Sequence, residues 1–136
     1  MNTILLVEDN PADILLTRRA FRSSDNVAIE VVTDGEQAVA RFEQAAEQGD
    51  YPSLVLLDLN LPRLSGLEVL KALKSHQEWR RTPVVMLSGS DRQSDIDAAY
   101  QHHANGYVTK PEGMRAFERA TKLLTDYWFD LVARPA

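Results

Sequence analysis

Short apolar segments alternate along the chain with longer segments in which apolar residues recur every three to four positions. A short apolar run bounded by turn residues is typical of a buried strand, whereas the three-to-four spacing is typical of an amphipathic helix. We expect strands at residues 3–7, 28–32, 53–57, 83–87 and 106–109, and helices at residues 11–22, 35–48, 65–75, 93–102 and 114 to about 132. This alternation predicts an α/β fold, in which helices flank a parallel sheet.

Two of the predicted elements differ from the others. The strand at residues 28–32 is interrupted by Glu30, which suits a strand at the edge of the sheet. The last helix exceeds the ordinary length of about 11–12 residues, and it carries an apolar stripe made of Phe117, Ala120, Leu124, Tyr127, Trp128 and Leu131. Either this stripe folds back onto the protein's own core, or its aromatic end packs against a second copy or another partner. The candidate dimer surface consists of Phe117, Tyr127, Trp128 and Phe129.

Composition narrows the classes of partner. With 136 residues, 44% of them hydrophobic, we expect a single domain at 1–136, with a core at about 2–125 and a C-terminal helical extension at about 126–136. The 20 acidic and 15 basic residues give a formal charge of -5, which weighs against nucleic acid and anionic membranes and favours a protein partner. There is no cysteine, and no apolar run approaches the ~20 residues of a membrane span, so we expect a cytoplasmic protein.

Four of the predicted strands end in polar residues. In chain order these are Glu8 and Asp9, then Asp58 with Asn60 two positions later, then Ser88, and finally Lys110 followed by Pro111. In an open parallel sheet the carboxyl ends of the strands meet at one edge, and ligands bind there. Any one of these residues alone is explained as a helix cap or a solvated turn residue. Four such strand ends together indicate a functional site.

The acidic residues predict a magnesium site. Carboxylates held close together repel one another, so Glu8, Asp9 and Asp58 need a cation among them. Mg²⁺ is a hard ion that prefers oxygen ligands and typically combines one or two carboxylates with a phosphate oxygen, whereas Ca²⁺ takes more ligands. No histidine pair accompanies the acids, which argues against zinc. Lys110 and Ser88 would complete the charges and donors that phosphoryl transfer requires, with one aspartate as the nucleophile.

With these residues aligned, the chain resembles the receiver domains of two-component response regulators over residues 2–125. The likeness rests on the acidic pair after the first strand, Asp58 at the end of the third strand, "LNLPRLSG" after it, Ser88 at the end of the fourth strand, and "YVTKP" at the fifth. The resemblance implies a flavodoxin-like (βα)5 fold, a doubly wound sheet with strand order 2-1-3-4-5.

The resemblance also implies a role for each acidic residue. Asp58 is expected to be the phosphoacceptor and a metal ligand, and Asp9 a direct Mg²⁺ ligand. Glu8 is expected to act on the metal mainly through water, and Asn60 to offer its backbone carbonyl.

The remaining residues of the motif are expected to serve the phosphoryl group and the signal. Lys110 would pair with the phosphoryl group, and a cis peptide bond before Pro111 would aim its ammonium into the site. Ser88 and Tyr107 would form a switch pair: the Ser88 hydroxyl moves toward a phosphoryl oxygen, and Tyr107 turns inward to fill the vacated space.

Among receivers, the chain is most similar to the stand-alone regulators that partner phytochrome-type histidine kinases. The stretches "ILLVEDNPADILLTRRAF" and "RRTPVVMLSGS" and the long aromatic last helix carry this likeness. It implies a sensor histidine kinase as partner and a homodimer formed through the fourth and fifth helices and the strand between them. It also implies output to a downstream protein whose identity the sequence does not specify.

Two positions depart from the receiver pattern. His103 stands where receivers commonly have glycine, and a left-handed turn would cost this residue about 1 kcal/mol, so we expect the turn to be reshaped. Gly113 stands where many receivers have a capping Asp or Asn, so the last helix is expected to start less firmly.

Three other functions compete with this interpretation. A hydrolase of the haloacid dehalogenase type needs a second catalytic aspartate two residues after its nucleophile, usually near the first strand, but here Asn60 follows a mid-chain Asp58. A receiver-like binding module that is not phosphorylated usually lacks an acid or the lysine, and all are present. A nucleotide-binding domain is set aside because neither glycine-rich phosphate motif occurs. We therefore expect a signalling phosphoacceptor and not an enzyme that turns over a separate substrate.

Overall fold

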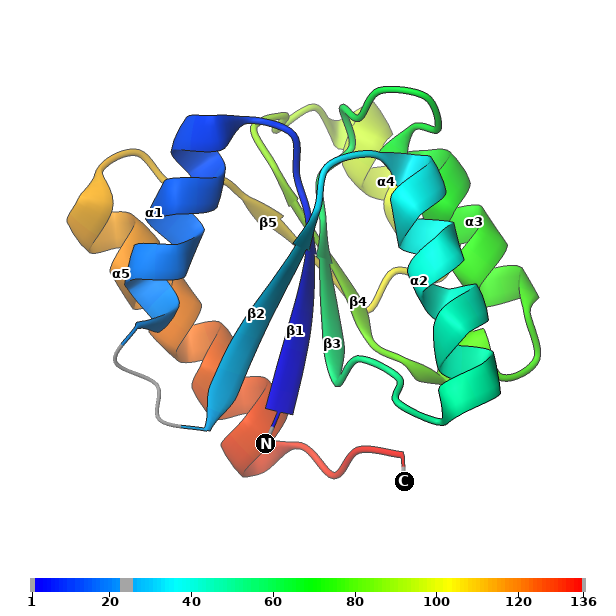
Figure 1. The fold of residues 1–136 in the computed structure, drawn as a ribbon. Coiled ribbons are helices and arrows are strands. Elements are labelled where there is room, and N and C mark those ends of the chain that lie inside the picture. The colour runs from blue at the N-terminus through cyan, green and yellow to red at the C-terminus, as the bar shows by residue number, and fades with distance from the viewer. Residues whose placement is uncertain (1, 23–25, 136) are drawn as a thin grey trace.

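The fold is a five-stranded parallel sheet covered by helices on both faces (Figure 1). The computed structural model describes residues 2–22 and 26–135, so Met1 and Ala136, the limits of the predicted domain, lie outside the described residues. The strands are β1 (Asn2–Val7), β2 (Val27–Val32), β3 (Leu54–Leu57), β4 (Val84–Ser88) and β5 (Gly106–Thr109). Their order is β2-β1-β3-β4-β5, and every pairing is parallel, which confirms the predicted fold and strand order.

The helices form two layers. Helices α1 (Pro11–Phe21) and α5 (Met114–Thr125) lie side by side on one face of the sheet, and α2 (Gly35–Gln48), α3 (Gly66–Ser75) and α4 (Gln93–Gln101) lie on the other (Figure 1). Side-chain caps start the first three. Asn10 and Asp34 accept backbone N–H groups at the starts of α1 and α2, and Ser65 forms a capping box at the start of α3. These caps fix the helix starts at the carboxyl edge of the sheet.

The strand side chains alternate between two apolar cores. Leu5 and Val7 of β1 face the side of α2 and α3, where Phe42 and Leu70 are also buried. Ile4 and Leu6 face the side of α1 and α5. Because β1, β3 and β4 are buried on both faces, these strands appear in the sequence as continuous apolar runs.

Strand β2 is an edge strand, as its sequence predicts. It pairs only with β1, and all of its residues are half-buried. Glu30 forms an ion pair with Arg41 of α2, with Nε of the arginine 2.5 Å from Oε2 of the glutamate. The charge in the middle of this strand therefore has a partner.

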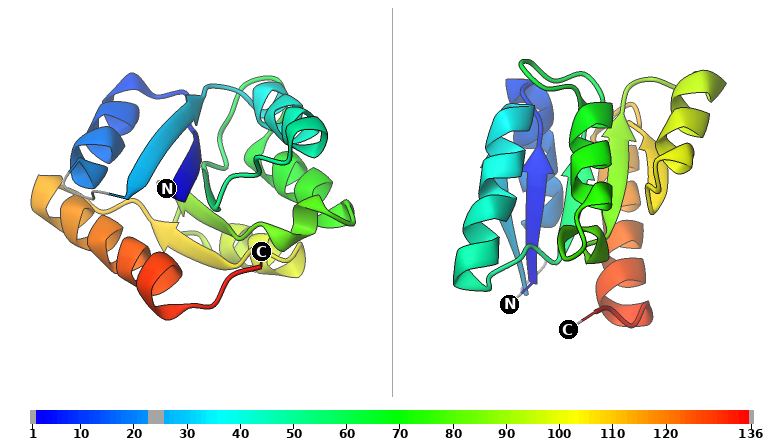
Figure 2. Two further views of the ribbon diagram at one scale, coloured as in Figure 1. Left: turned by 60° about the horizontal axis from the view of Figure 1, so that its bottom comes forward. Right: turned by 90° about the vertical axis from the view of Figure 1, so that its right-hand side faces the viewer.

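Helix α5 continues as a π-helix, η2 (Asp126–Leu131), beyond the end of the sheet (Figure 2). The predicted long helix is present, but its aromatic side chains divide between core and surface. Phe117 is 3% exposed and Trp128 is 9% exposed, both within the core under α1 and α5, and Phe129 is half-buried against that core. The proposed dimer surface is therefore wrong for Phe117 and Trp128, which fold back onto the sheet. Tyr127, at 50% exposed, stays on the surface.

Two turns test the departures from the receiver pattern. The turn at His103 is not reshaped: the residue adopts the left-handed conformation with φ 72° despite its Cβ. That prediction is wrong because the turn is held by backbone bonds, in which Ala104 N–H donates to Ala99 and Asn105 N–H donates to Val84. Gly113 provides no side-chain cap for α5, as predicted. Among the described residues, no helix is both long enough and apolar enough to span a membrane.

Candidate functional site

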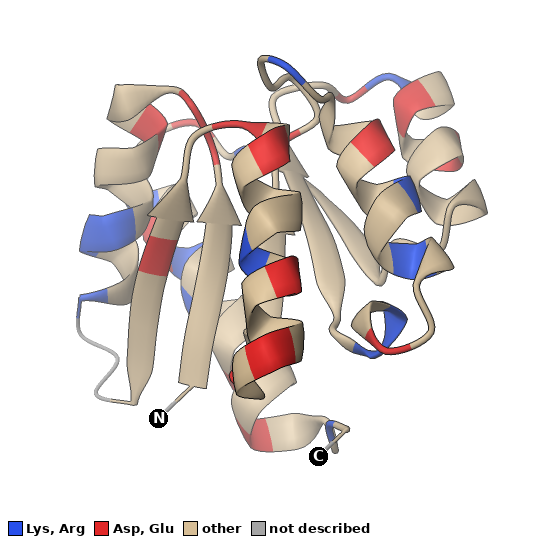
Figure 3. Ribbon diagram, turned by 45° about the vertical axis from the view of Figure 1, so that its right-hand side comes forward, with Lys and Arg blue, Asp and Glu red and all other residues tan. Residues whose placement is uncertain are grey.

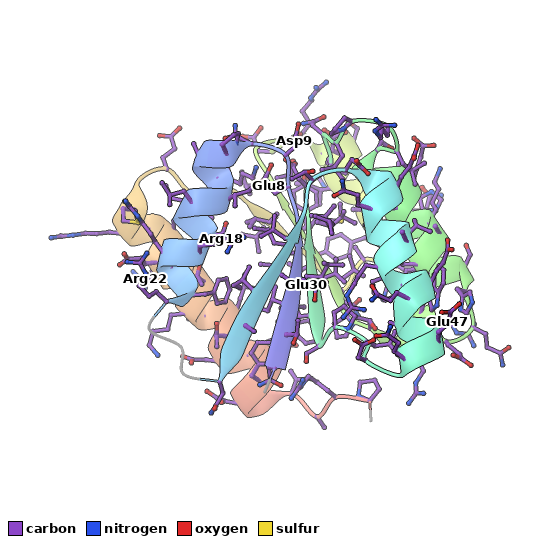
Figure 4. All side chains as sticks on the ribbon, in the orientation of Figure 1. Glu8, Asp9, Arg18, Arg22, Glu30 and Glu47 are labelled. Atoms are coloured by element: carbon purple, nitrogen blue, oxygen red, sulfur yellow. The ribbon has the colours of Figure 1, made fainter. Side chains whose placement is uncertain are left out.

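Acidic residues gather where β1 and β3 end, at the carboxyl edge of the sheet (Figure 3). Glu8 and Asp9 follow β1 directly, and Figure 4 places both where this strand leads into α1. One carboxylate oxygen each from Glu8, Asp9 and Asp58 lies within 4.8 Å of the others. Glu8 and Asp58 are buried and Asp9 is exposed, so the cluster opens to solvent on one side. The predicted juxtaposition of these three residues is confirmed.

Close backbone packing fixes Asp58. Its N–H donates to the Val7 carbonyl of β1, with an N to O distance of 3.1 Å, and its Oδ1 lies 3.4 Å from the Asn60 backbone N. Gly66, at the start of α3, lies so close that a Cβ there would overlap the Asp58 carbonyl and come within 2.7 Å of the Leu59 Cα. The glycine of "LNLPRLSG" therefore allows α3 to start directly against the strand that carries Asp58.

Lys110 lies among three carboxylates. Its Nζ is 2.6 Å from Oε1 of Glu8 and 3.2 Å from Oδ2 of Asp58. It is also 2.7 Å from Oδ2 of Asp13, a residue of α1 that the sequence analysis did not single out. Asp13 follows no strand, so the strand-end criterion missed it. The sequence feature that could have identified Asp13 is the helix start at Asn10–Pro11, which places this residue in the first turn of α1.

Burial and charge shift the pKa values of the buried partners. Burial raises the pKa of Glu8 to about 7. The hydrogen bond from Lys110 opposes this shift, and the negative charge of Asp58 adds to it. Burial on its own lowers the pKa of Lys110, but hydrogen bonds to Asp13 and Glu8 and the charge of Asp58 outweigh it, so the pKa rises. Lys110 is therefore a cation, and the buried Glu8 carboxylate is costly to charge without a positive partner.

Ser88 and Tyr107 lie at the same edge of the sheet. Ser88 is fully buried at the end of β4, and its hydroxyl oxygen accepts the Ser90 N–H at 3.3 Å. The Tyr107 hydroxyl donates to the Ser90 carbonyl at 2.8 Å, and its ring packs against the core on the α2 and α3 side. Both members of the predicted switch pair thus bond to Ser90 in the loop that leads to α4.

One prediction about the backbone is wrong. There is no cis peptide bond among the described residues, so the Lys110–Pro111 bond is trans. Backbone position explains why Lys110 still reaches the site. Its N–H donates to the Ser88 carbonyl at 2.7 Å, which holds its Cα at the carboxyl edge of the sheet.

The donor set suits a hard divalent cation. Glu8, Asp9 and Asp58 offer only carboxylate oxygens, the ligands that Mg²⁺ and Mn²⁺ accept. The raised pKa of Glu8 reflects burial that a bound cation would offset. A site with an accessible carboxylate cluster on one side and a lysine on the other is arranged to bind and transfer a phosphoryl group.

Comparison with known proteins identifies the family. The family model of the response regulator receiver domain matches residues 4–122. The chain belongs to this family. It is 37% identical over 140 residues to the response regulator Rcp1 of Synechocystis sp., a match that covers 98% of this chain and 92% of that protein. It is therefore a homologue of a receiver-domain signalling regulator.

Solved structures agree with this assignment. The Mn²⁺-bound form of Rcp1 is 34% identical and covers 100% of both chains, with a TM-score of 0.91. The phosphorylated cyanobacterial phytochrome response regulator RcpA is 37% identical and covers 99% of both chains, with a TM-score of 0.93. The receiver domain of the sensor kinase PA1611 of Pseudomonas aeruginosa, with a magnesium ion in its active-site cleft, is 28% identical over 93% of this chain and 96% of that chain, with a TM-score of 0.74.

Proposed function

We propose that the protein accepts a phosphoryl group on Asp58 from a histidine kinase and signals through the resulting change in its surface. The observation that carries this proposal is the convergence of Glu8, Asp9 and Asp58 within 4.8 Å, with the Lys110 ammonium against two of them. The homologues support it, because RcpA is described as phosphorylated and as a phytochrome response regulator. A cytoplasmic location stays a prediction.

In the proposed reaction, a carboxylate oxygen of Asp58 attacks the phosphorus of a phosphohistidine. The new O–P bond forms as the P–N bond breaks, and the histidine imidazole leaves with the bonding electron pair and takes up a proton. Lys110 offsets negative charge on the transferring group, and the Ser88 hydroxyl, at the end of the strand that pairs with β3, donates to it after a rotamer change. Bound Mg²⁺, held by Glu8, Asp9, Asp58 and the Asn60 carbonyl, would supply further positive charge for the phosphoryl oxygens.

The switch is proposed to run through Ser90. The Ser90 backbone is bonded both to the Ser88 hydroxyl and to the Tyr107 hydroxyl. Reorientation of Ser88 toward a phosphoryl oxygen removes its bond to the Ser90 N–H, which frees this loop and the Tyr107 ring to move. The change reaches α4 because the Ser90 hydroxyl also donates to Asp95 in its first turn.

Incubation with Mg²⁺ and acetyl phosphate tests the phosphorylation. We expect one phosphoryl group per chain, and none in Asp58→Asn, whose amide is a poor nucleophile. Labelling of the variant would contradict the assignment of Asp58. Sustained turnover of a free phosphate ester would favour the hydrolase alternative, and no labelling of the wild-type protein would favour the binding module. A phytochrome-type kinase is the expected natural donor, and a comparison of transfer rates from several kinases tests that pairing.

We also propose that the protein forms a homodimer through the exposed part of α5 and η2. A shallow, mostly apolar hollow lies there. It is lined by Val108, Ala120, Leu123, Leu124, Asp126, Tyr127 and Leu131. Leu123 is 61% exposed and Leu131 75%, so two large apolar side chains of this hollow lie open to solvent. Leu123→Lys together with Tyr127→Lys should halve the mass in solution, whereas Leu15→Lys, an exposed leucine on α1, should leave it unchanged. Equal masses for all three proteins would contradict a dimer through this surface.

A further inference from the structure

Asp13 contacts the lysine of the site without belonging to the metal cluster. The Asn10 side chain accepts the N–H groups of Ala12 and Asp13, which fixes Asp13 in the first turn of α1. From there its Oδ2 lies 2.7 Å from Nζ of Lys110. The Asp13 side chain is 31% exposed, compared with 2% for Glu8 and 9% for Asp58. Lys110 is thus held on its solvent side by a carboxylate supplied from another element of the fold.

The three carboxylates around Lys110 are not equivalent. Glu8 and Asp58 are members of the cluster that suits a divalent cation, and Asp13 is not. A carboxylate that ligates a cation has less negative charge to offer an ammonium, and the cation also repels the ammonium directly. When Glu8 and Asp58 serve as metal ligands, Asp13 is therefore the partner of Lys110 that keeps its full charge.

We infer that Asp13 is a positioning residue, which keeps the Lys110 ammonium at the phosphoryl site when Glu8 and Asp58 ligate the metal. This inference rests on the proposed phosphorylation of Asp58. Asp13 would not touch the transferred group and acts through Lys110. Without it, Lys110 has only the two metal-ligating carboxylates as partners, so it competes with the cation for Glu8 or swings toward solvent.

Asp13→Asn tests the inference, with Asp91→Asn as the matched control. Asp91 is an exposed residue of the loop after β4 at the same edge of the sheet, so its substitution removes the same charge without touching Lys110. The rate of phosphorylation by acetyl phosphate is measured at saturating Mg²⁺. We expect Asp13→Asn to be slower by on the order of 10-fold or more, because a misplaced catalytic group is costly. Asp91→Asn should match the wild-type protein, and Asp13→Glu should recover part of the rate.

A second measurement does not depend on activity. Titration calorimetry with Mg²⁺ alone should show weaker binding to Asp13→Asn than to Asp91→Asn, because Lys110 then competes for Glu8. Equal affinities, or an Asp13→Asn rate equal to that of wild type at saturating Mg²⁺, would overturn the inference.

A double substitution shows whether Asp13 acts through Lys110. In a Lys110→Met background, the change Asp13→Asn should cause no further loss of rate, because its partner is already absent. A further loss as large as in the wild-type background would overturn the positioning role. Failure of the wild-type protein to be labelled would instead overturn the proposed function, so the two failures are distinguishable.

Discussion

Replacing Glu8 with glutamine is expected to remove a pH dependence from the stability of the metal-free protein. The Glu8 side chain is 2% exposed, and burial raises its pKa from 4.5 to about 7. A carboxyl with a higher pKa in the folded state binds its proton more tightly there, so it favours folding at low pH. This contribution is lost as the pH rises from about 4.5 to about 7. At ~1.4 kcal/mol per pH unit, the difference between the pKa values of the unfolded and the folded state corresponds to about 3 kcal/mol of folding free energy.

The prediction is measured as the difference in free energy of unfolding between the wild-type protein and Glu8→Gln. Urea unfolding is followed between pH 5 and pH 8 in the presence of a chelator. The difference, wild type minus variant, should fall with rising pH by up to about 3 kcal/mol. Lys110 does not interfere, because its pKa is raised and its contribution is lost only at strongly alkaline pH. Taking the difference between the two proteins also cancels the pH dependence that comes from titratable groups present in both.

A control and a reversal sharpen the test. Glu47→Gln replaces an exposed glutamate of α2 and should follow the wild-type protein at every pH (Figure 4). Excess Mg²⁺ should weaken the trend in the wild-type protein, because a cation stabilises the charged form of Glu8. A difference between wild type and Glu8→Gln that stays constant from pH 5 to pH 8 would refute the reasoning that burial makes this charge costly.

Three further substitutions test the packing around the site and the core. Gly66→Ala should lower the free energy of unfolding by about 1–3 kcal/mol and slow phosphorylation, because a Cβ there overlaps the Asp58 carbonyl. Gly89→Ala, with open space around its position, is the control for stability only, because Gly89 lies between Ser88 and Ser90, and equal losses of stability would contradict the close approach. In urea unfolding, Trp128→Ala should lower the free energy of unfolding by about 3 kcal/mol, because the tryptophan is buried, and Leu131→Ala should lower it by less than about 0.5 kcal/mol, because the leucine is exposed. Similar losses for the two variants would contradict burial of the tryptophan. Lys74→Met should lower the free energy of unfolding by about 1–3 kcal/mol, because the backbone oxygens of Arg80 and Thr82 and the side-chain oxygen of Asn105 lose their donor. An unchanged urea midpoint of unfolding would refute this.

The strands and most of the site were predictable because both depend on local patterns. Strands buried on both faces must be apolar throughout, so the polar residue that ends each run marks the carboxyl edge of the sheet. Glu8, Asp58 and Lys110 were found in this way. Asp13 was not, because its place beside Lys110 depends on how α1 packs against the sheet, which no pattern within α1 specifies.

The C-terminal helix shows a second limit of the sequence. Its three-to-four spacing predicts an apolar stripe, but spacing alone does not say which aromatic side chains meet the core. Adjacent side chains on a helix point in different directions, and in the π-helical segment η2 Trp128 is buried while Tyr127 is exposed. The left-handed His103 was also misjudged, because backbone bonds from neighbouring residues outweigh its local preference.

The most direct test of the central claim is to locate the phosphoryl group by mass spectrometry after reaction with acetyl phosphate. We predict that a single group is found on the peptide containing Asp58, that it requires Mg²⁺, and that it is lost at alkaline pH as an acyl phosphate is. A phosphoryl group on any other residue, or equal labelling of Asp58 in the presence of excess chelator, would contradict the proposal that this carboxylate accepts phosphate with the help of a metal.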